Sequence, residues 1–365
     1  MANQAEDARI VGSVRAETGM VGRPESATAS GSFRALLLQA ANELVLTQLD
    51  RRPLQVGQVR IRVRTVGVCG SDYSSVAGRL RFTRFPIVPG HEVVGDVMEA
   101  ATTADWAIGE HVVVHPLIVH RDDPAFASAE LQHAATAEVL GVVSRDGAFA
   151  EEVVVEDYML RRIPEDLAWE AAAFIEPVAV AVRALERGGL VDGERLLLLG
   201  AGSIGLLLLQ VALTSGAGEV VVTDVLDDRL VIARKLGAVG TVNVRSDVRA
   251  AEQLRDFDLV IDGVGSPEST RLAIQSARRG GRIVVYGVPA AENTVTMASL
   301  FAPDLSIAAS RLYGRDLSRA IDLVASGAIR GDLLVTHRVG LVEAEQLIPA
   351  VIAGQVSPIK VQIVP

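Results

Sequence analysis

The stretch R-L-L-L-L-G-A-G-S-I-G at residues 195–205 decides the fold of the second half of the chain. Four consecutive Leu residues predict a buried strand, and the glycines after them predict a tight turn that opens a helix. Gly200 permits the turn, Gly202 lets the backbone approach a pyrophosphate, and Gly205 lets the helix pack closely. The free N–H groups at the helix start attract the anion. The predicted cofactor-binding residues of this turn are Gly200, Gly202, Ser203, Ile204 and Gly205.

Strand-like and helix-like segments alternate on both sides of this turn. An Ala-rich helical stretch begins near Trp169, before the turn. Alternation of this kind predicts a doubly wound parallel sheet. The segments expected after the turn are a helix at 203–214, a strand at 219–223, a helix at 227–236, and strands at 257–261 and 282–286.

Asp224 lies 19 residues after Gly205, at the end of the second predicted strand. A carboxylate at this place accepts hydrogen bonds from a ribose 2′-OH and repels a 2′-phosphate, which favours NAD over NADP. Arg229 is close enough in sequence to leave the strictness of this choice open. An alternative is that Asp224 only caps the helix expected to begin at Asp227.

The first half of the chain is rich in short strands. The pattern V-R-I-R-V-R at 59–64 alternates strictly, which indicates a half-buried strand, and Val-rich segments follow at 92–97, 111–114 and 149–155. Their spacing predicts a compact β-barrel-like domain, which strands in the last fifty residues could complete. The expected domains are a disordered extension at 1–32, a catalytic domain at 33–178, a nucleotide-binding domain at 179–313, and a return to the catalytic domain at 314–365.

Composition narrows the range of partners. A formal net charge of −10 opposes binding to nucleic acid or to an anionic membrane surface. The apolar runs end well before the roughly 20 residues that a membrane helix needs. Only Cys69 carries a thiol, so an intrachain disulfide is impossible and a reducing compartment is tolerated. A small-molecule partner and a cytoplasmic location are expected.

Potential zinc ligands precede the nucleotide turn. They are Cys69 in C-G-S-D, His91 and Glu92 in P-G-H-E, and Glu176 in I-E-P. Zinc takes Cys sulfur, His nitrogen and carboxylate oxygen, and the wide spacing favours a catalytic site over a structural one. Adjacent side chains on a strand diverge, so His91 and Glu92 could both bind only if the chain bends at Gly90. Whether Glu92 or Glu176 binds directly or through water stays open.

Hydride removal from a secondary alcohol requires that its hydroxyl also lose a proton. Bound zinc lowers the pKa of water from about 15.7 to about 7, and a comparable shift would activate an alcohol. Ser71 could pass the alcohol proton outward, and Asp72 could orient a zinc-bound imidazole. The alternatives are a turn-forming Ser and a helix-capping Asp. Ser71, Asp72 and Glu92 are therefore the predicted catalytic residues at this end of the chain.

With these residues in view, the chain resembles the zinc-dependent medium-chain dehydrogenase/reductase family, in particular its branch of sorbitol, xylitol and L-idonate dehydrogenases. The resemblance runs from about Arg34 to the C-terminus and implies an α/β architecture, a GroES-like β-barrel catalytic domain plus a Rossmann domain. The motifs that carry it are V-G-V-C-G-S-D at 66–72, P-G-H-E at 89–92, R-D-G-A-F-A-E at 145–151, E-P-V-A-V at 176–180, G-A-G-S-I-G at 200–205 and D-G-V-G at 262–265.

The resemblance also implies further roles. The Glu at position 176 is typical of the polyol branch, and Arg311 in S-R-L-Y resembles an Arg that contacts substrate hydroxyls. Val264 and Val288 are expected to line the nicotinamide pocket. A homodimer or homotetramer is expected from the family alone.

Three positions depart from the family pattern. Family members often bind a second, structural zinc through four closely spaced Cys, but residues 117–143 contain none, so one catalytic zinc is expected and His120 and His133 are expected at the surface. A His that often ends the proton relay is replaced by Ser74. Arg183 stands where polyol enzymes often have His, which could change the charge of the cleft.

The sequence therefore predicts a zinc- and NAD-dependent oxidoreductase that interconverts a secondary hydroxyl and a ketone on a polyol, sugar acid or cyclitol. One alternative is a dehydrogenase of another secondary alcohol, such as an amino alcohol or aminocyclitol. A more distant alternative is a metal-free nucleotide-binding protein with a regulatory role, in which the ligand residues are only core packing.

Overall fold

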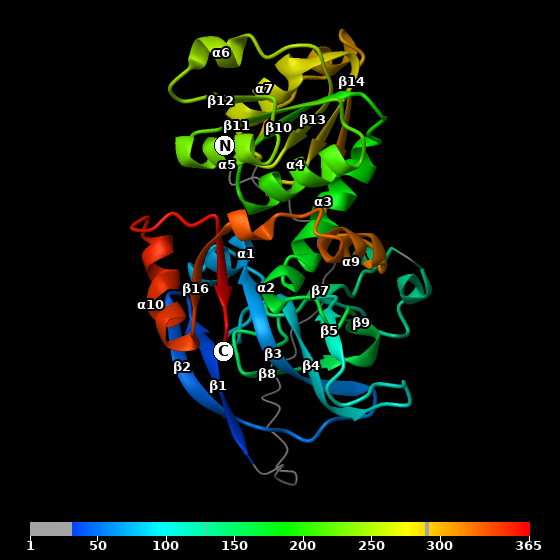
Figure 1. Cartoon of the computed structure of the whole chain (residues 1–365), viewed down its shortest axis with the longest axis vertical. Coiled ribbons are helices and arrows are strands. Elements are labelled where there is room, and N and C mark those ends of the chain that lie inside the picture. Colours follow the sequence, from blue (N-terminus) through cyan, green and yellow to red (C-terminus); the bar gives the residue numbers. More distant parts are fainter. Residues whose placement is uncertain (1–30, 129, 289–291) are drawn as a thin grey trace, which may run out of the picture.

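The computed structural model describes residues 31–128, 130–288 and 292–365. Two β-sheets form two lobes, with the parallel sheet in one and the first and last strands of the chain in the other (Figure 1). Most of the extension predicted at 1–32 lies outside the described residues, and strand β1 begins at Ser32. An α/β fold is confirmed.

The second lobe contains a six-stranded sheet in which every neighbouring pair is parallel. Its strand order is β12-β11-β10-β13-β14-β15, so the first strand of the lobe lies at the centre and the order reverses beside it. Ligands of such sheets bind at the carboxyl ends of the strands at this reversal point. The strands are β10 (Arg195–Leu199), β11 (Glu219–Asp224), β12 (Gly240–Asn243), β13 (Phe257–Asp262), β14 (Ala277–Val285) and β15 (Ser306–Ala309).

The first lobe is built on a seven-stranded sheet of order β16-β17-β3-β4-β5-β9, with β8 also paired to β3. Strand β17 pairs antiparallel with β3, so the C-terminal segment, red in Figure 1, joins strands from the first third of the chain. The domain boundaries predicted near 178 and 313 stay predictions. The strands are β3 (Gln58–Val68), β4 (Glu92–Ala101), β5 (His111–Val114), β8 (Glu152–Glu156), β9 (Leu160–Arg162), β16 (Val335–Val339) and β17 (Lys360–Ile363).

Two antiparallel pairs accompany this sheet. Strands β1 (Ser32–Ala40) and β2 (Glu43–Asp50) form one, and β6 (Leu117–Ile118) and β7 (Glu138–Val139) form the other. Bridges from Ala35 to Ala150 and from Leu38 to Ile87 attach the first pair to the rest of the lobe. These contacts join the first pair to the strands and loops of the larger sheet.

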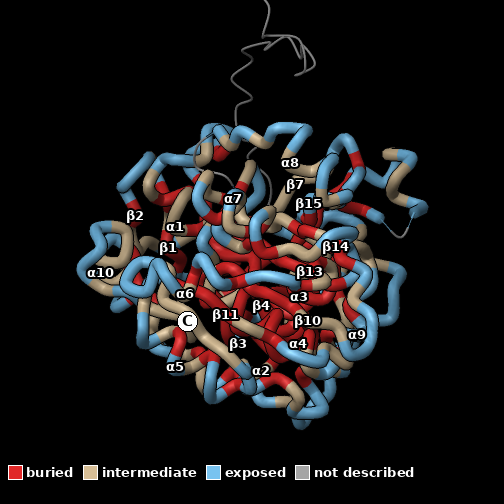
Figure 2. Tube along the Cα trace, turned by 90° about the horizontal axis from the view of Figure 1, so that it is seen from above, coloured by how far each residue is buried: buried red, intermediate tan, exposed pale blue. Residues whose placement is uncertain are grey.

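The helices cover the sheets and fill the space between the lobes. The long helix α3 packs on α4 and α9 and also contacts β4 and β14, so it belongs to the core that the two lobes share. Buried residues follow the central strands in Figure 2. The helices are α1 (Gly70–Val76), α2 (Trp169–Ala172), α3 (Ile175–Gly188), α4 (Ser203–Thr214), α5 (Asp227–Lys235), α6 (Val248–Glu252), α7 (Pro267–Ser276), α8 (Met297–Phe301), α9 (Ser318–Ala325) and α10 (Leu341–Ile352).

None of these helices combines the length and the apolar character needed to cross a membrane.

Candidate active site

Cys69 lies between β3 and α1, where it forms the N-cap of the helix. The fully buried Asp72, in the first turn, accepts a hydrogen bond from the Cys69 N–H at Oδ2 (2.8 Å). Its other oxygen accepts a hydrogen bond from the Gly90 N–H (3.3 Å) and lies 3.4 Å from His91 Nδ1. A single carboxylate therefore ties together the two chain segments that carry Cys69 and His91.

The turn before β4 brings two adjacent side chains into one site. Gly90 has a φ of 100°, a conformation that other residues rarely adopt, and a Cβ there would lie 2.4 Å from Phe149 Cδ1. The chain bends here, so His91 and Glu92 do not diverge as they would on a regular strand. This is the bend that simultaneous use of both residues requires.

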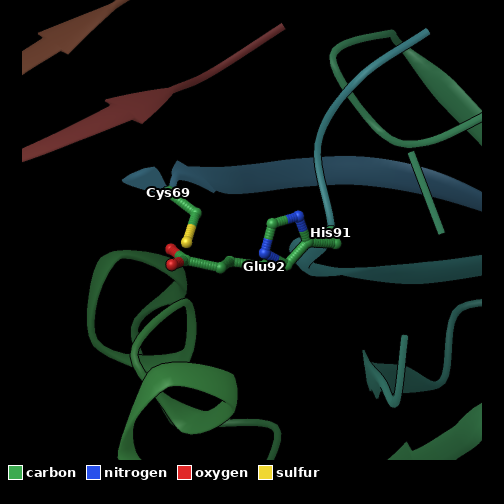
Figure 3. A group of neighbouring side chains, drawn as sticks. All are labelled: Cys69, His91 and Glu92. Atoms are coloured by element: carbon green, nitrogen blue, oxygen red, sulfur yellow. The ribbon is translucent and has the colours of Figure 1, made fainter. Parts of the chain in front are cut away.

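Ligand atoms of Cys69, His91 and Glu92 lie within 4.8 Å of one another. In Figure 3 the sulfur faces the carboxylate of Glu92, and a ring nitrogen of His91 points toward both. His91 and Glu92 are buried and Cys69 is half-buried. We call these three residues the metal cluster.

The chemistry of the metal cluster fits zinc. One thiol, one imidazole and one carboxylate are ligands that zinc prefers, and catalytic zinc usually has three protein ligands. Nδ1 of His91 is buried and makes no hydrogen bond of good geometry with any described residue, although Asp72 lies 3.4 Å away. Burial lowers the pKa of His91, but Asp72 and Cys69 outweigh it and the pKa is raised well above its usual value. A cation is therefore favoured at this place.

Lys360 brings a cation to the metal cluster from the last strand of the chain. Its ammonium forms a buried ion pair with Glu92 Oε2 and also donates to the Val68 carbonyl (3.3 Å). Burial lowers the pKa of Lys360, but Glu92 and Cys69 raise it more, so the residue stays charged. Glu92 therefore has two candidate cationic partners, Lys360 and a metal ion.

Glu176 lies in the first turn of α3 and is 4% exposed. Its Oε1 accepts a hydrogen bond from the hydroxyl of Tyr313 (2.8 Å), which lies 137 residues further along the chain. Burial raises the pKa of Glu176 to about 7, with Glu92 adding to the shift and His91 opposing it. Glu176 is thus an electrostatic neighbour of the metal cluster but not one of its three members.

The other predicted residues near the metal cluster occupy distinct positions. Ser71 lies in α1 and is half-buried, whereas the Ser74 hydroxyl donates to the Gly70 carbonyl (3.0 Å) within the same helix. Arg183 forms an ion pair with Glu130 (3.1 Å), so the positive charge expected to alter the cleft is compensated. Arg311 is exposed and donates to the Gln132 carbonyl (3.4 Å).

The predicted nucleotide turn has the expected geometry. Gly200 has a φ of 102° and α4 begins immediately after Gly202. A Cβ on Gly205 would lie 2.0 Å from the Gly200 carbonyl oxygen, so only glycine lets the helix approach the turn. The hydroxyl of Ser203 is buried at the helix start and has no hydrogen-bond partner within residues 31–128, 130–288 and 292–365. A free donor beside unpaired N–H groups fits a phosphate.

Asp224 lies at the carboxyl end of β11, beside this turn. Its Oδ2 accepts a hydrogen bond from the Ala201 N–H (2.7 Å), and its Oδ1 accepts from the N–H groups of Val225 (2.8 Å) and Leu226 (3.0 Å). The cap of α5 is Leu226, so Asp224 does not cap that helix by the usual geometry. Instead it holds the glycine-rich turn against the end of the strand.

A cavity of about 550 Å³ opens beside Asp224. Gly200, Val264 and Arg245 contribute to its wall, and Ser266 and Ser269 lie at the start of α7. Arg229 is not among the lining residues and donates instead to Ser357 Oγ (3.4 Å) and the Pro358 carbonyl (3.5 Å). Val288 is 84% exposed and does not line this cavity either.

The cysteine-free segment at 117–143 packs around a small apolar cluster that includes Leu117 and Leu131. Phe126 has the guanidinium groups of Arg121 and Arg315 over its ring, at 5.7 and 4.9 Å. His120 and His133 are exposed, as expected. Side chains therefore pack this segment together.

Sequence reasoning missed Lys360, Tyr313 and Arg245. Lys360 and Gln362 are both buried on β17, so two polar residues alternating with Val and Ile on a short strand were the available signal for buried partners. Nothing in the sequence around Tyr313 or Arg245 sets them apart from surface residues.

Comparisons with known proteins agree with this geometry. Residues 55–165 match the model of the alcohol dehydrogenase GroES-like domain, and residues 203–326 match that of the zinc-binding dehydrogenase. The chain belongs to the zinc-type medium-chain dehydrogenase/reductase family, on its polyol dehydrogenase-like branch. It is therefore an oxidoreductase, and the alternative of a metal-free regulatory protein is set aside. The family implies zinc, a nicotinamide cofactor and small-molecule alcohols.

Individual relatives span most of the chain. Sorbitol dehydrogenase of Bacillus subtilis is 26% identical, covering 93% of this chain and 99% of the relative. L-threonine 3-dehydrogenase of Streptomyces coelicolor is 35% identical, covering 78% and 85%.

Two solved structures are similar throughout. An Escherichia coli dehydrogenase, RspB, complexed with NADH has a TM-score of 0.84 at 28% identity and covers 92% of this chain and 99% of its own. A zinc-binding dehydrogenase of Sinorhizobium meliloti bound to NADP has a TM-score of 0.85 at 27% identity and covers 92% and 100%.

Proposed function

We propose that this enzyme uses NAD and one zinc ion to interconvert a secondary hydroxyl and a ketone on a polyol, sugar acid or cyclitol. The observation that carries the proposal is the metal cluster of Cys69, His91 and Glu92, with Glu176 as a buried neighbour. Sorbitol dehydrogenase among the relatives supports a polyol as substrate.

Zinc, when bound, supplies a Lewis acid that makes a substrate hydroxyl acidic enough to lose its proton near neutral pH. Cys69, His91 and a carboxylate would hold the ion, and Asp72 would fix the His91 ring through Nδ1. Ser71, two residues from Cys69, would accept the hydroxyl proton and pass it outward. Because the Ser74 hydroxyl is bound to the Gly70 carbonyl, the proton leaves through water or a cofactor hydroxyl.

NAD is the proposed cofactor because Asp224 is a fixed negative charge at the ribose end of the turn. Three backbone N–H groups hold its carboxylate beside the cavity, where it would repel a 2′-phosphate. Arg229 does not compensate this charge, since its guanidinium is directed to Ser357. An NADP-bound neighbour in the family makes this preference a point to test.

An amino alcohol is the second candidate substrate class. L-threonine 3-dehydrogenase of Streptomyces coelicolor is 35% identical to this chain, and L-threonine carries a secondary hydroxyl beside an amine. The same hydride transfer would apply. An acidic residue would then hold the ammonium group of the substrate, whereas an Arg would suit the carboxylate of a sugar acid.

The test is a measurement of zinc per chain together with NADH production. The panel comprises polyols, sugar acids, cyclitols and L-threonine, each with NAD and with NADP. About one zinc per chain and turnover of a polyol-like substrate with NAD are expected. A protein without zinc and without turnover on the whole panel contradicts the proposal, and turnover of L-threonine alone favours the second candidate.

A homo-oligomer is proposed from the open edge of the parallel sheet. Strand β15 is the last strand of that sheet, and Ile307 on it and Met297 and Phe301 before it are exposed. Apolar side chains on an unpaired edge favour association with a second copy. Light scattering of the zinc-loaded protein would give the mass. The cytoplasmic location stays a prediction from the sequence.

A further inference from the structure

The hydroxyl of Tyr313 is directed at a carboxylate of the proposed site rather than at solvent. Tyr313 is 3% exposed and lies in the segment that leads from β15 to α9. Its hydroxyl donates to Glu176 Oε1 at 2.8 Å. In the part of the chain that the structure describes, no other side chain donates a hydrogen bond to Glu176.

His115 fixes the position of the Tyr313 ring. The two rings meet edge to face with centroids 5.0 Å apart at 71°. His115 is 1% exposed, accepts a hydrogen bond from the Leu117 N–H at Nδ1 (3.3 Å), and bonds through Nε2 to the Gly314 carbonyl (2.9 Å). Burial lowers the pKa of His115 to about 4, so the ring is neutral, with its proton on Nε2. Tyr313 and its neighbour Gly314 are therefore held by one rigid ring.

The two oxygens of Glu176 differ in their surroundings. Oε1 is occupied by Tyr313, whereas Oε2 accepts no hydrogen bond from the described residues. Glu176 is an electrostatic neighbour of His91 and Glu92 without belonging to the metal cluster. With Oε1 held by Tyr313, Oε2 is the oxygen that is left for another partner.

We propose that Tyr313 is a positioning residue that fixes Glu176 so that Oε2 faces the metal cluster. This inference rests on the proposed function, because it concerns how that site binds its ion. The phenol acts through Glu176 and touches neither ion nor substrate, since its proton is already shared with Oε1. Partners of this kind orient metal ligands, and their loss typically costs about 10- to 100-fold in metal affinity.

The first experiment compares Tyr313→Phe with the unmodified protein. Zinc affinity is measured by competition with a chromophoric chelator, and the ligand geometry is read from the visible spectrum of the cobalt-substituted protein. We expect zinc to bind about 10- to 100-fold more weakly and the cobalt bands to shift. Tyr158→Phe is the matched control, because in the described part of the chain the Tyr158 hydroxyl bonds only to backbone groups of Val119. It should leave both readouts unchanged.

The second experiment tests whether Tyr313 acts through Glu176. In a double-mutant cycle with Glu176→Gln, the effect of Tyr313→Phe on zinc affinity should shrink to less than about 2-fold, because coupled residues are not additive. Equal effects in both backgrounds would mean that Tyr313 acts by another route. That result would overturn the inference.

The remaining outcomes are also decisive. If the unmodified protein binds zinc but Tyr313→Phe matches it in affinity and spectrum, the inference fails and the proposed function stands. If the unmodified protein binds neither zinc nor cobalt, the proposed function fails first. If Tyr313→Phe loses NADH binding as well as zinc, the hydroxyl has a general structural role and the positioning role is overturned.

Discussion

The metal cluster and the nucleotide turn differ in which atoms build them and in how far apart in sequence those atoms lie. The metal cluster is made of side chains, and its partners extend from Cys69 to Lys360, almost the whole length of the sequence. The nucleotide turn is made largely of backbone, and the hydrogen bond between Ala201 and Asp224 joins residues only 23 positions apart. One region depends on long-range folding and the other on a local strand, turn and helix.

This difference has an energetic consequence. The metal region buries Glu92, Glu176, Lys360 and Asp72, and buried charges are tolerated only while each keeps its partner. At the nucleotide turn a single charge, that of Asp224, is satisfied by backbone N–H groups beside a cavity. Substitutions around the metal cluster should therefore change stability as well as chemistry, and those at the nucleotide turn should act mainly on cofactor affinity.

Cys69→Ser should separate the two regions most sharply. The variant loses the only thiol of the chain, so zinc binding and turnover should fall together. We expect kcat/KM to decrease by more than about 100-fold, beyond the cost of losing an outer partner of a metal site. NADH affinity, measured by fluorescence titration, should change by less than about 2-fold. Near-normal turnover would refute the role of Cys69.

Lys360→Met should show the stability cost of the metal region. It leaves Glu92 buried without its cation, and breaking a buried pair typically costs about 3–5 kcal/mol. The free energy of unfolding, measured with urea on zinc-free protein, should fall by that amount. Adding Glu92→Gln to Lys360→Met removes the unpaired charge and should restore much of the loss. An exposed pair, Arg330 with Asp332, provides the control, since Arg330→Met should have little effect.

Glu176→Gln should change how the stability of the zinc-free protein depends on pH. The pKa of Glu176 is raised to about 7, so between pH 4.5 and about 7 the folded state holds a proton that the unfolded state has released. Stability should therefore fall as pH rises through this window, by at most about 1.4 kcal/mol per pH unit. The free energy of unfolding, measured at pH 5, 6, 7 and 8, should change less with pH for the variant than for the unmodified protein. Parallel profiles would mean that Glu176 ionises normally.

Asp224→Ala should have the smallest of these effects, and it should act mainly on the binding of the nucleotide. Losing the carboxylate removes the predicted ribose contact and the hydrogen bonds from three backbone N–H groups, so NAD should bind about 10-fold more weakly. NADP should lose less, because repulsion of its 2′-phosphate disappears at the same time. The ratio of the two dissociation constants is the readout. Arg229→Ala is the control and should leave that ratio unchanged, because its guanidinium is bound to Ser357.

Much of the fold was predictable because its signals are local. Periodicity and glycine placement predict the strand and helix at 195–214 and the alternating strand at 59–64. The structure has all three elements at these positions. Strand β8 begins at Glu152, three residues later than the segment predicted from Phe149. Local pattern alone does not fix where pairing with β3 starts.

The candidate site was predictable by residue type but not by its network. The structure brings together Cys69, His91 and Glu92. A thiol, an imidazole and a carboxylate are ligand types that zinc prefers, so residue type alone suggested this group. The pairing of Glu92 with Lys360 and of Glu176 with Tyr313 spans 268 and 137 residues. Such contacts arise only after the lobes have folded, so no spacing rule reveals them.

The position of β17 places a constraint on how this protein is made. Strand β17 supplies Lys360 and follows the parallel sheet in the sequence, yet it pairs with β3 from the first third of the chain. All strands of the parallel sheet have been made once the chain has passed Ala309, so this sheet can fold during synthesis, as domains generally do. The first lobe must wait for β17, and Glu92 lacks the partner Lys360 until that strand is made. Ribosomes stalled shortly before residue 360 would therefore hold a nascent chain with a finished nucleotide sheet and an unfinished metal site.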